Sequence, residues 1–388
     1  MTVCDRLRPF GTTIFTEISR LAAEHRAINL AQGFPDFDGP EHVKQAAIEA
    51  VRAGHSQYAR MAGTLELCRS VADYFSREAG LSFNPETDIT VTAGCTEAIA
   101  AALLGLLNPG DEVILFEPYY DSYRASVALA GGVPRFVTLR GPGFEFDPAE
   151  LSRAVSPRTR AVLVNTPHNP TGRVFTRGEL QSIADLCLRH GLVAIVDEVY
   201  ERLVYGGPSS HVRLASLPGM AERTLTLSSL GKTFSLTGWK IGWAVGPAEL
   251  SSAVRAAHQF LTFAVSTPMQ HAAAAALDSP PAYFDELVTS YRSKRDFLAD
   301  SLRRIGFTFR DPEGSYFIYA DHRPVSARLG LTTDVEMSKH LIERIGVAAI
   351  PPSVFYEDKA EGSKYLRFAF CKKDETLAAA VERLRSLA

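Results

Sequence analysis

Cysteine is scarce in this sequence, which has five cysteines among 388 residues and no CxxC pair. So few and widely spaced cysteines exclude a disulfide framework and a structural zinc site, and they are typical of free, buried thiols in a reducing compartment. The longest apolar run, residues 98–107, is far shorter than the ~20 residues that cross a bilayer. The first residues also lack the apolar core and cleavage site of a secretory signal. We therefore expect a cytoplasmic protein without a membrane span or a metal ion.

The sequence also lacks a charge excess and the familiar nucleotide motifs. Acidic and basic residues number 44 and 41, without long runs of one sign, so nothing predicts binding to nucleic acid or to an anionic membrane. The strand-to-helix junction at 92–96 does not fit GxGxxG, which disfavours a nicotinamide enzyme. The Gly-Lys-Thr at 231–233 is not a P-loop, because that motif needs glycine where Thr226 stands. We expect small molecules or other protein chains as partners.

What is present is an alternation of short β-branched runs with longer helical stretches between about 88 and 250. This pattern is typical of a mostly parallel sheet covered by helices, that is, an α/β fold. From about 283 the composition changes to a charge-rich amphipathic helix followed by short strands near 316–319 and 365–370, which predicts a separate α+β lobe. In the first part we expect strands at 88–92, 112–116, 133–139, 161–164, 192–196 and 224–227, with helices at 95–107 and 177–190.

Two polar segments at predicted strand ends are candidates for ligand binding. Thr92-Ala-Gly-Cys-Thr96 opens a helix, where backbone amides and the helix dipole could hold a phosphate, although many α/β loops look alike. Residues 165–172, NTPHNPTG, specify a rigid turn and place the amide of Asn169 where α/β sheets bind ligands. Each segment by itself fits a purely structural turn as well.

Two further segments carry charged side chains. Asp197 follows an apolar strand and must find a cation or hydrogen-bond donors, as a helix N-cap or as part of a site. Lys232 lies in a Ser/Gly-rich loop, where it is either a surface lysine or an amine activated for Schiff-base chemistry by a lowered pKa. Because all four segments end strands of one sheet, they could face a single ligand.

This ordered set of motifs resembles the pyridoxal-phosphate-dependent fold type I aminotransferases of class I/II, over essentially the whole chain. The segments that carry the resemblance are LAQGFPDF, NTPHNPTG, DEVY, SSLGKTFSLTGWKIGW and YLRFAF. The likeness is greatest to bacterial methionine aminotransferases and kynurenine/glutamine aminotransferases, through GTTIF, NLAQGFPDFDGP, EPYYDSY, HQFLTF and GVAAIPPSVF. The resemblance implies a mostly parallel seven-stranded sheet in a large cofactor domain (41–280), a smaller α+β domain (281–388), and an N-terminal arm that joins it (1–40).

The resemblance also implies roles around the cofactor ring. Lys232 would form the Schiff base with pyridoxal 5'-phosphate and move the proton between the substrate Cα and the cofactor C4′. Asp197 would pair with the protonated pyridine nitrogen, which makes the ring an electron sink. Tyr200 and Asn169 would hydrogen-bond the ring 3′ oxygen, and Tyr120 would stack on the ring.

For the phosphate, the resemblance implies the amides of Gly94, Cys95 and Thr96, with Ser229 and Lys240 beside them. Tyr58 matches a tyrosine that reaches this phosphate from a partner subunit, so a homodimer with shared active sites is implied.

For the substrate, the resemblance implies that Arg367 clamps the α-carboxylate, helped by Asn169 and the backbone at Gly33. The strand period places Leu366, Phe368 and Phe370 on one face and Arg367 on the other, where without the resemblance it reads as an ordinary exposed arginine.

Near the substrate side chain, the resemblance points to Phe15, Tyr58 and the stretch 260–263. Two departures stand out: Cys95 replaces a glycine or alanine, and His168 replaces a commoner asparagine. Since only the amide of residue 95 is needed, neither departure removes a catalytic group.

The predicted function is a ping-pong transamination between an L-α-amino acid, of methionine, aromatic, glutamine or kynurenine type, and a 2-oxo acid. Cysteine-conjugate β-lyase activity and N-succinyl-diaminopimelate transamination are the alternatives on the same scaffold. A ligand-sensing regulator built on an aminotransferase domain is disfavoured, because the ~60 residues of a DNA-binding segment do not fit before Gly33.

Overall fold

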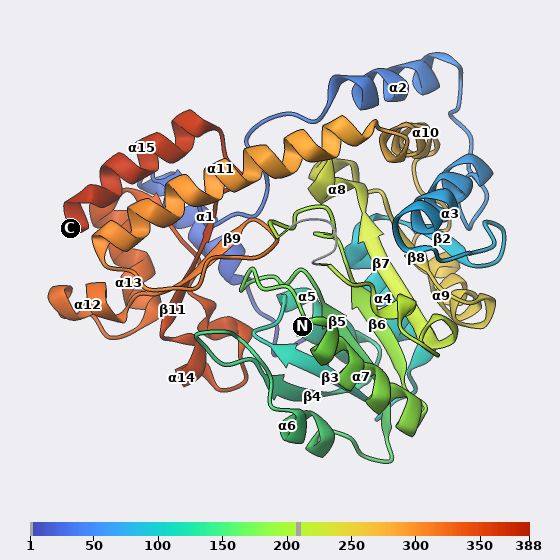
Figure 1. Ribbon diagram of the computed structural model, residues 1–388, viewed down its shortest axis with the longest axis horizontal. Coiled ribbons are helices and arrows are strands. Elements are labelled where there is room, and N and C mark those ends of the chain that lie inside the picture. Colours follow the sequence, from blue (N-terminus) through green and yellow to red (C-terminus); the bar gives the residue numbers. More distant parts are fainter. Residues whose placement is uncertain (1–2, 207–210) are drawn as a thin grey trace.

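The computed structural model describes residues 3–206 and 211–388 and is built around a seven-stranded sheet (Figure 1). The strand order is β2-β8-β7-β6-β5-β3-β4, and β8 runs antiparallel to both of its neighbours while the other pairs are parallel. The α/β fold with a mostly parallel seven-stranded sheet is thus confirmed. The strands are β2 (Ile89–Thr92), β3 (Glu112–Glu117), β4 (Val133–Thr138), β5 (Thr159–Asn165), β6 (Val193–Asp197), β7 (Thr224–Ser229) and β8 (Gly242–Val245).

Helices on both faces bury the sheet, which explains why its inner strands read as continuous apolar runs. Every residue of β3 and β7 is buried, for example. The helices of this part are α2 (Glu41–Arg52), α3 (Leu65–Ala79), α4 (Gly94–Leu106), α5 (Asp121–Leu129), α6 (Pro148–Arg153), α7 (Arg177–His190), α8 (Leu230–Thr233), α9 (Ala248–Leu261) and α10 (Thr267–Leu277).

The six strands predicted along this part of the chain are confirmed, with ends that shift by one or two residues. Strand β8 was not predicted, because it has only four residues and begins with a glycine. The structure gives the reason for that glycine: a Cβ at Gly242 would lie 2.6 Å from the Gly94 carbonyl carbon and 2.7 Å from the Cys95 nitrogen. A strand that packs directly under the start of α4 therefore cannot carry a side chain there.

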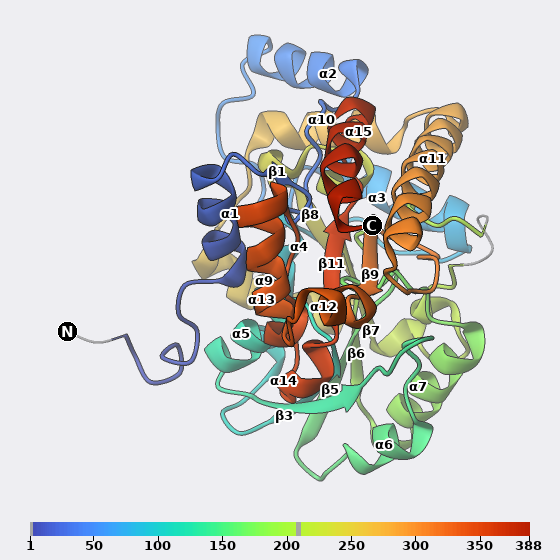
Figure 2. The same cartoon turned by 90° about the vertical axis from the view of Figure 1, so that its left-hand side faces the viewer.

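A smaller lobe combines both ends of the chain. In Figure 2, α1 (Ile14–Glu24, blue) lies beside the C-terminal elements (red). Strand β1 (Ile28–Asn29) pairs in parallel with β10 (Val347–Ala348), although more than three hundred residues separate them. The lobe also contains α11 (Pro281–Ile305), β9 (Phe317–Asp321), α12 (Arg323–Leu329), α13 (Asp334–His340), α14 (Lys359–Gly362), β11 (Tyr365–Ala369) and α15 (Asp374–Leu384).

The described residues bear on three sequence features, namely membrane spans, metal-binding groups and cysteines. None of the helices there is both long and apolar enough to cross a bilayer, and no group of three or more His, Cys, Asp or Glu side chains could hold a metal ion. All five cysteines are free thiols, but Cys4 is exposed, so the expectation of buried thiols was wrong at that position. The domain boundaries near 40 and 280 stay a prediction.

Candidate active site

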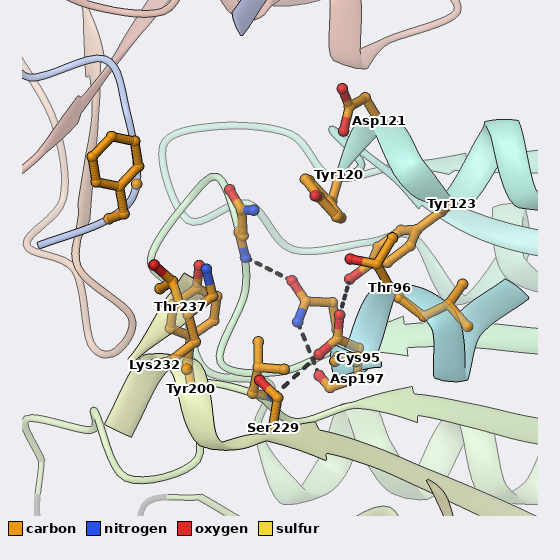
Figure 3. A pocket seen from close by; sticks show the side chains of 18 of the residues that line it. Cys95, Thr96, Tyr120, Asp121, Tyr123, Asp197, Tyr200, Ser229, Lys232 and Thr237 are labelled. Carbon is orange, nitrogen blue, oxygen red and sulfur yellow. Dashed lines mark hydrogen bonds between the residues drawn. The ribbon is translucent and has the colours of Figure 1, made fainter. Parts of the chain in front are cut away.

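A cavity of about 470 Å³ lies at the carboxyl ends of the central strands, and the smaller lobe closes one side of it (Figure 3). Ligands bind at this edge in α/β sheets generally. Nearly all the predicted site residues line this cavity, although they come from segments spread over the whole chain: Phe15, Gly33, Gly94, Cys95, Thr96, Tyr120, Asn169, Asp197, Tyr200, Ser229, Lys232, Lys240 and Arg367. Tyr58 is the exception.

One end of the cavity is built to hold an anion. Helix α4 begins there at Gly94, and its N-cap residue Ala93 offers no side-chain acceptor, so the first amides of the helix are free to bind a ligand. Gly94 has a φ of 73°, and a Cβ at this position would lie 3.2 Å from Lys240 Nζ. Lys240 itself has a φ of 55°, a left-handed conformation that is costly for a lysine. The backbone conformations at Gly94 and Lys240 therefore allow the Lys240 ammonium to lie close to the first amides of α4.

A hydrogen-bonded pair, Glu97 and His258, is attached to this anion-binding end. Glu97, in the first turn of α4, accepts the Ala93 N–H, and its other oxygen lies 2.6 Å from His258 Nδ1. His258 Nε2 lies 3.0 Å from the Met61 carbonyl and must donate to it, because a carbonyl only accepts. The pair thus joins α4 to α9 and to the loop that follows Tyr58.

The cavity also contains a buried carboxylate. Asp197 is the last residue of β6 and is only 4% exposed. Tyr123 Oη donates to its Oδ2 at 2.7 Å, the Val199 N–H donates to its Oδ1 at 3.2 Å, and the Cys95 thiol lies beside it. Burial raises the pKa of Asp197, while these donors and Lys232 oppose the increase. A carboxylate kept here needs a cation or donor from a ligand to complete its pairing.

The amide turn is fixed to the same carboxylate-bearing strand. Asn165 Nδ2 donates to the Asp197 carbonyl at 2.9 Å, and its Oδ1 accepts the Asn169 N–H at 2.7 Å. His168 is fully enclosed, its Nδ1 lies 2.7 Å from Thr171 Oγ1, and burial lowers its pKa to about 3. It is therefore a neutral structural residue, and the turn aims Asn169 into the cavity.

Lys232 lies on the short helix α8, which directly follows strand β7, and it lines the same cavity as Asp197 and the anion-binding residues. Its Nζ is 5.7 Å from the ring centroid of Tyr200 and 5.8 Å from that of Tyr316. Although part of the side chain is open to the cavity, the surrounding atoms desolvate the ammonium and lower its pKa, and nearby Arg367 adds to this effect. A lysine in this setting loses its proton more readily than a surface lysine and can act as a nucleophile or a base.

Arg367 forms the wall opposite the sheet and is only 2% exposed. Its two Nη atoms donate to Asn169 Oδ1 and to the Ala31 carbonyl, both at 2.9 Å. The rings of Phe317 and Phe15 lie 4.2 and 5.1 Å from its guanidinium carbon. Within the described residues its Nε has no hydrogen-bond partner. The interpretation as an exposed strand arginine was wrong, because β11 pairs with β9 and its other face is covered as well.

Tyr58 and the stretch 260–263 lie outside the cavity of their own chain. Tyr58 is 83% exposed and Phe260 84% exposed, and the Tyr58 ring packs edge-on against Phe263 with 5.4 Å between ring centroids. Within this chain the structure therefore does not bring these aromatic residues near Lys232.

The geometry can now be set beside known proteins. The family model described as aminotransferase class I and II matches residues 25–384, which is nearly the whole chain. The chain belongs to this family. Members of the class use pyridoxal phosphate, and transamination is the reaction of this enzyme.

Individual relatives support the same assignment. The chain is 48% identical to a probable N-succinyldiaminopimelate aminotransferase of Mycobacterium tuberculosis, covering 100% of this chain and 99% of that one. It is 42% identical to the methionine aminotransferase of Escherichia coli, covering 98% and 97%. The solved structure of N-succinyldiaminopimelate aminotransferase from Mycobacterium tuberculosis superposes with a TM-score of 0.96, at 48% identity and full coverage of both chains.

The cavity of this aminotransferase fits pyridoxal phosphate. The amides at the start of α4, with Lys240 held against Gly94, suit a phosphate group. The incompletely paired carboxylate of Asp197 suits a protonated ring nitrogen. Lys232 lines the same cavity, and its amine, with its lowered pKa, suits a carbonyl partner. The donor set therefore matches the three functional parts of the cofactor.

Some site residues were not found from the sequence. Tyr123 stands in the motif EPYYDSY, yet only the structure shows that its hydroxyl donates to Asp197. Asn165 begins NTPHNPTG, and only the structure shows that it fixes Asn169. Asp121 lines the cavity as well, and its place directly after Tyr120 was the available signal.

Proposed function

We propose that this aminotransferase acts on L-α-amino acids with uncharged side chains, of methionine, aromatic, glutamine or kynurenine type, and on the matching 2-oxo acids. The observation that carries the proposal is the distribution of cations in the cavity. Among the described lining residues, the cations are Lys232, Lys240 and Arg367. If Lys240 faces the phosphate and Lys232 the reacting carbon, Arg367 remains for a single carboxylate.

In this proposal Arg367 and Asn169 bind the α-carboxylate. The guanidinium is already fixed by Asn169 and Ala31, so it does not lose much conformational freedom when the substrate binds. Its unpartnered Nε supports a further hydrogen bond to the ligand. The backbone at Gly33 adds to this subsite, where a Cβ would lie 2.7 Å from the Phe317 ring.

The cofactor supplies an electron sink for the electrons left at the substrate Cα when its proton is removed. We propose that Lys232 removes and returns that proton, because burial lowers the pKa of its amine and so favours the deprotonated form that can act as a base. Asp197 keeps the ring nitrogen protonated, with Tyr123 and Val199 holding its carboxylate in place. Tyr200 and Asn169 would hold the ring oxygen by hydrogen bonds.

The remaining cofactor contacts follow from the same placement. Tyr120 would stack on the ring. The amides of Gly94, Cys95 and Thr96, with Ser229 and Lys240, would bind the phosphate.

The region beyond the reacting centre supports an uncharged side chain. Phe15, Phe34 and Phe317 line the cavity on the side of Arg367, and they offer apolar area to a thioether or aromatic group.

A second candidate is N-succinyl-diaminopimelate transamination. The relative with 48% identity over the full chain supports it.

We also propose a cytoplasmic homodimer. Tyr58, Phe260 and Phe263 are exposed, and the Tyr58 ring packs against Phe263. The segment of Tyr58 is connected to α4 through Met61, whose carbonyl contacts His258, and through Glu97. An exposed group of this kind favours burial against a second copy, which would bring Tyr58 to the partner's phosphate site. Free cysteines are consistent with a reducing compartment.

A half-reaction screen tests the substrate proposal. The holoenzyme is mixed with single amino acids without an oxo acid, and loss of the absorbance of the lysine-bound cofactor is followed in a stopped-flow instrument. We expect methionine, phenylalanine, glutamine and kynurenine to react at least tenfold faster than aspartate and glutamate. The opposite order would contradict the proposal, and N-succinyl-L,L-diaminopimelate as the fastest donor would establish the second candidate. Pyruvate and ammonia released from a β-substituted cysteine would indicate β-lyase activity.

A further inference from the structure

Asp121 is a negative charge that the reaction chemistry does not use. It is the first residue of α5, directly after Tyr120, and it lines the same cavity as Lys232 and Arg367. In Figure 3 Tyr120 lies between Asp121 and Asp197, so the two carboxylates occupy different ends of the site. Asp121 therefore cannot serve the ring nitrogen that Asp197 faces.

The surroundings keep this carboxylate available to a ligand. Within the described residues no Lys, Arg or His nitrogen lies within 4.0 Å of Asp121, and its hydrogen bond is to the Ser122 N–H in its own helix turn. It is half-buried, and burial raises its pKa, while the positive charge of Arg367 opposes the increase. Asp121 and Arg367 line the same cavity, and the charge of each shifts the pKa of the other.

We propose that Asp121 is a specificity-determining residue that rejects substrates with a side-chain carboxylate and favours those with a neutral or N–H-bearing end. The inference rests on the proposed function, because it explains how the enzyme discriminates among donors once Arg367 has bound the α-carboxylate.

The physical reason is charge at close range in a poorly solvated site. A second carboxylate on the substrate would enter a cavity whose arginine is already used and whose nearest free charge is negative, so repulsion would oppose binding. A side-chain amide of the same size has no charge to repel and can donate an N–H to Asp121. Glutamine and glutamate therefore form a matched substrate pair that differs only in this group.

The test is Asp121→Asn, which keeps the size of the side chain and an oxygen for the Ser122 N–H. We expect the glutamine-to-glutamate ratio of kcat/KM to fall about tenfold, from a gain for glutamate and a loss for glutamine. The kcat/KM for methionine is expected to stay within about threefold, because its side chain presents neither a charge nor an N–H group. Calorimetric binding of glutarate and its monoamide gives the same ratio without turnover.

Two further variants separate charge from structure. Asp147→Asn removes an exposed carboxylate that caps α6 outside the cavity, and it should leave the ratio unchanged. Asp121→Glu keeps the charge and should keep the wild-type preference.

An unchanged ratio in Asp121→Asn overturns the inference, and so does an equal loss for glutamine, glutamate and methionine, which would mark a structural role. The proposed function is judged separately, by the wild-type order of donors. The two can therefore fail independently.

Discussion

The hydrogen bond from Tyr123 to Asp197 gives a sharp prediction about cofactor binding. Asp197 is 4% exposed, and Tyr123 Oη donates to its Oδ2 at 2.7 Å. A hydrogen bond to a buried charge contributes roughly 1.5–3 kcal/mol. At 1.36 kcal/mol for each pKa unit, the substitution Tyr123→Phe should raise the pKa of Asp197 by roughly one to two units, beyond the increase that burial already causes.

The sign of the pH effect follows from the state that binds the ring. The protonated pyridine nitrogen needs an ionised Asp197, so affinity for pyridoxal phosphate falls as the pH falls through the pKa of Asp197 in the empty site. In Tyr123→Phe that fall begins at higher pH. We expect cofactor binding by Tyr123→Phe to become about tenfold weaker than in the wild type at the acidic end of the range, and to stay within about threefold of it at the alkaline end.

Equilibrium dialysis of pyridoxal phosphate across this pH range measures the effect. Tyr119→Phe is the matched control, because Tyr119 is also buried. Its hydroxyl accepts a hydrogen bond from Arg124 at 3.3 Å and makes none with Asp197. If Tyr123→Phe and the control gave the same pH dependence, the hydrogen bond would not govern the charge of Asp197 and the reasoning would be refuted.

Two other substitutions test the substrate clamp and the acid stability. Arg367→Lys keeps a charge but loses the planar fork that Asn169 and Ala31 orient, so kcat/KM should fall about a hundredfold, largely through KM; a change below threefold in steady-state assays would contradict the clamp. Glu112→Gln removes a carboxylate. Arg135 and the other hydrogen-bond donors lower the pKa of Glu112 to about 2, so the carboxylate stabilises the fold above about pH 4.5, and this stabilisation is lost as the pH falls towards 2. Urea unfolding should show about 2 kcal/mol of destabilisation at pH 7 and clearly less at pH 3.5, and equal losses would argue against an ionic contribution.

Local patterns in the sequence were enough to locate the sheet and the ends of most strands. Apolar runs such as 193–197 end at a polar residue because a strand buried on both faces admits none until it emerges, and this placed Asp197 correctly. The same reasoning located the helix that starts at Gly94 and placed Lys232 just after a strand, but the prediction of a loop there was wrong, because Lys232 lies on the short helix α8. It could not find β8, whose glycine at 242 is required by a close approach to Gly94 that no local pattern reveals.

The sequence by itself therefore determined the fold class, the strand ends that carry the chemistry and, through ordered motifs, the family. Tertiary structure decided which side chains meet. Arg367 is buried because the Ala31 carbonyl, 336 residues earlier, accepts its hydrogen bond, and Tyr123 reaches Asp197 across 74 residues. The periodicity of a segment indicates only which of its side chains are buried and which are exposed. The charge state of a lysine or an aspartate depends instead on neighbours that the folded chain brings together from distant segments.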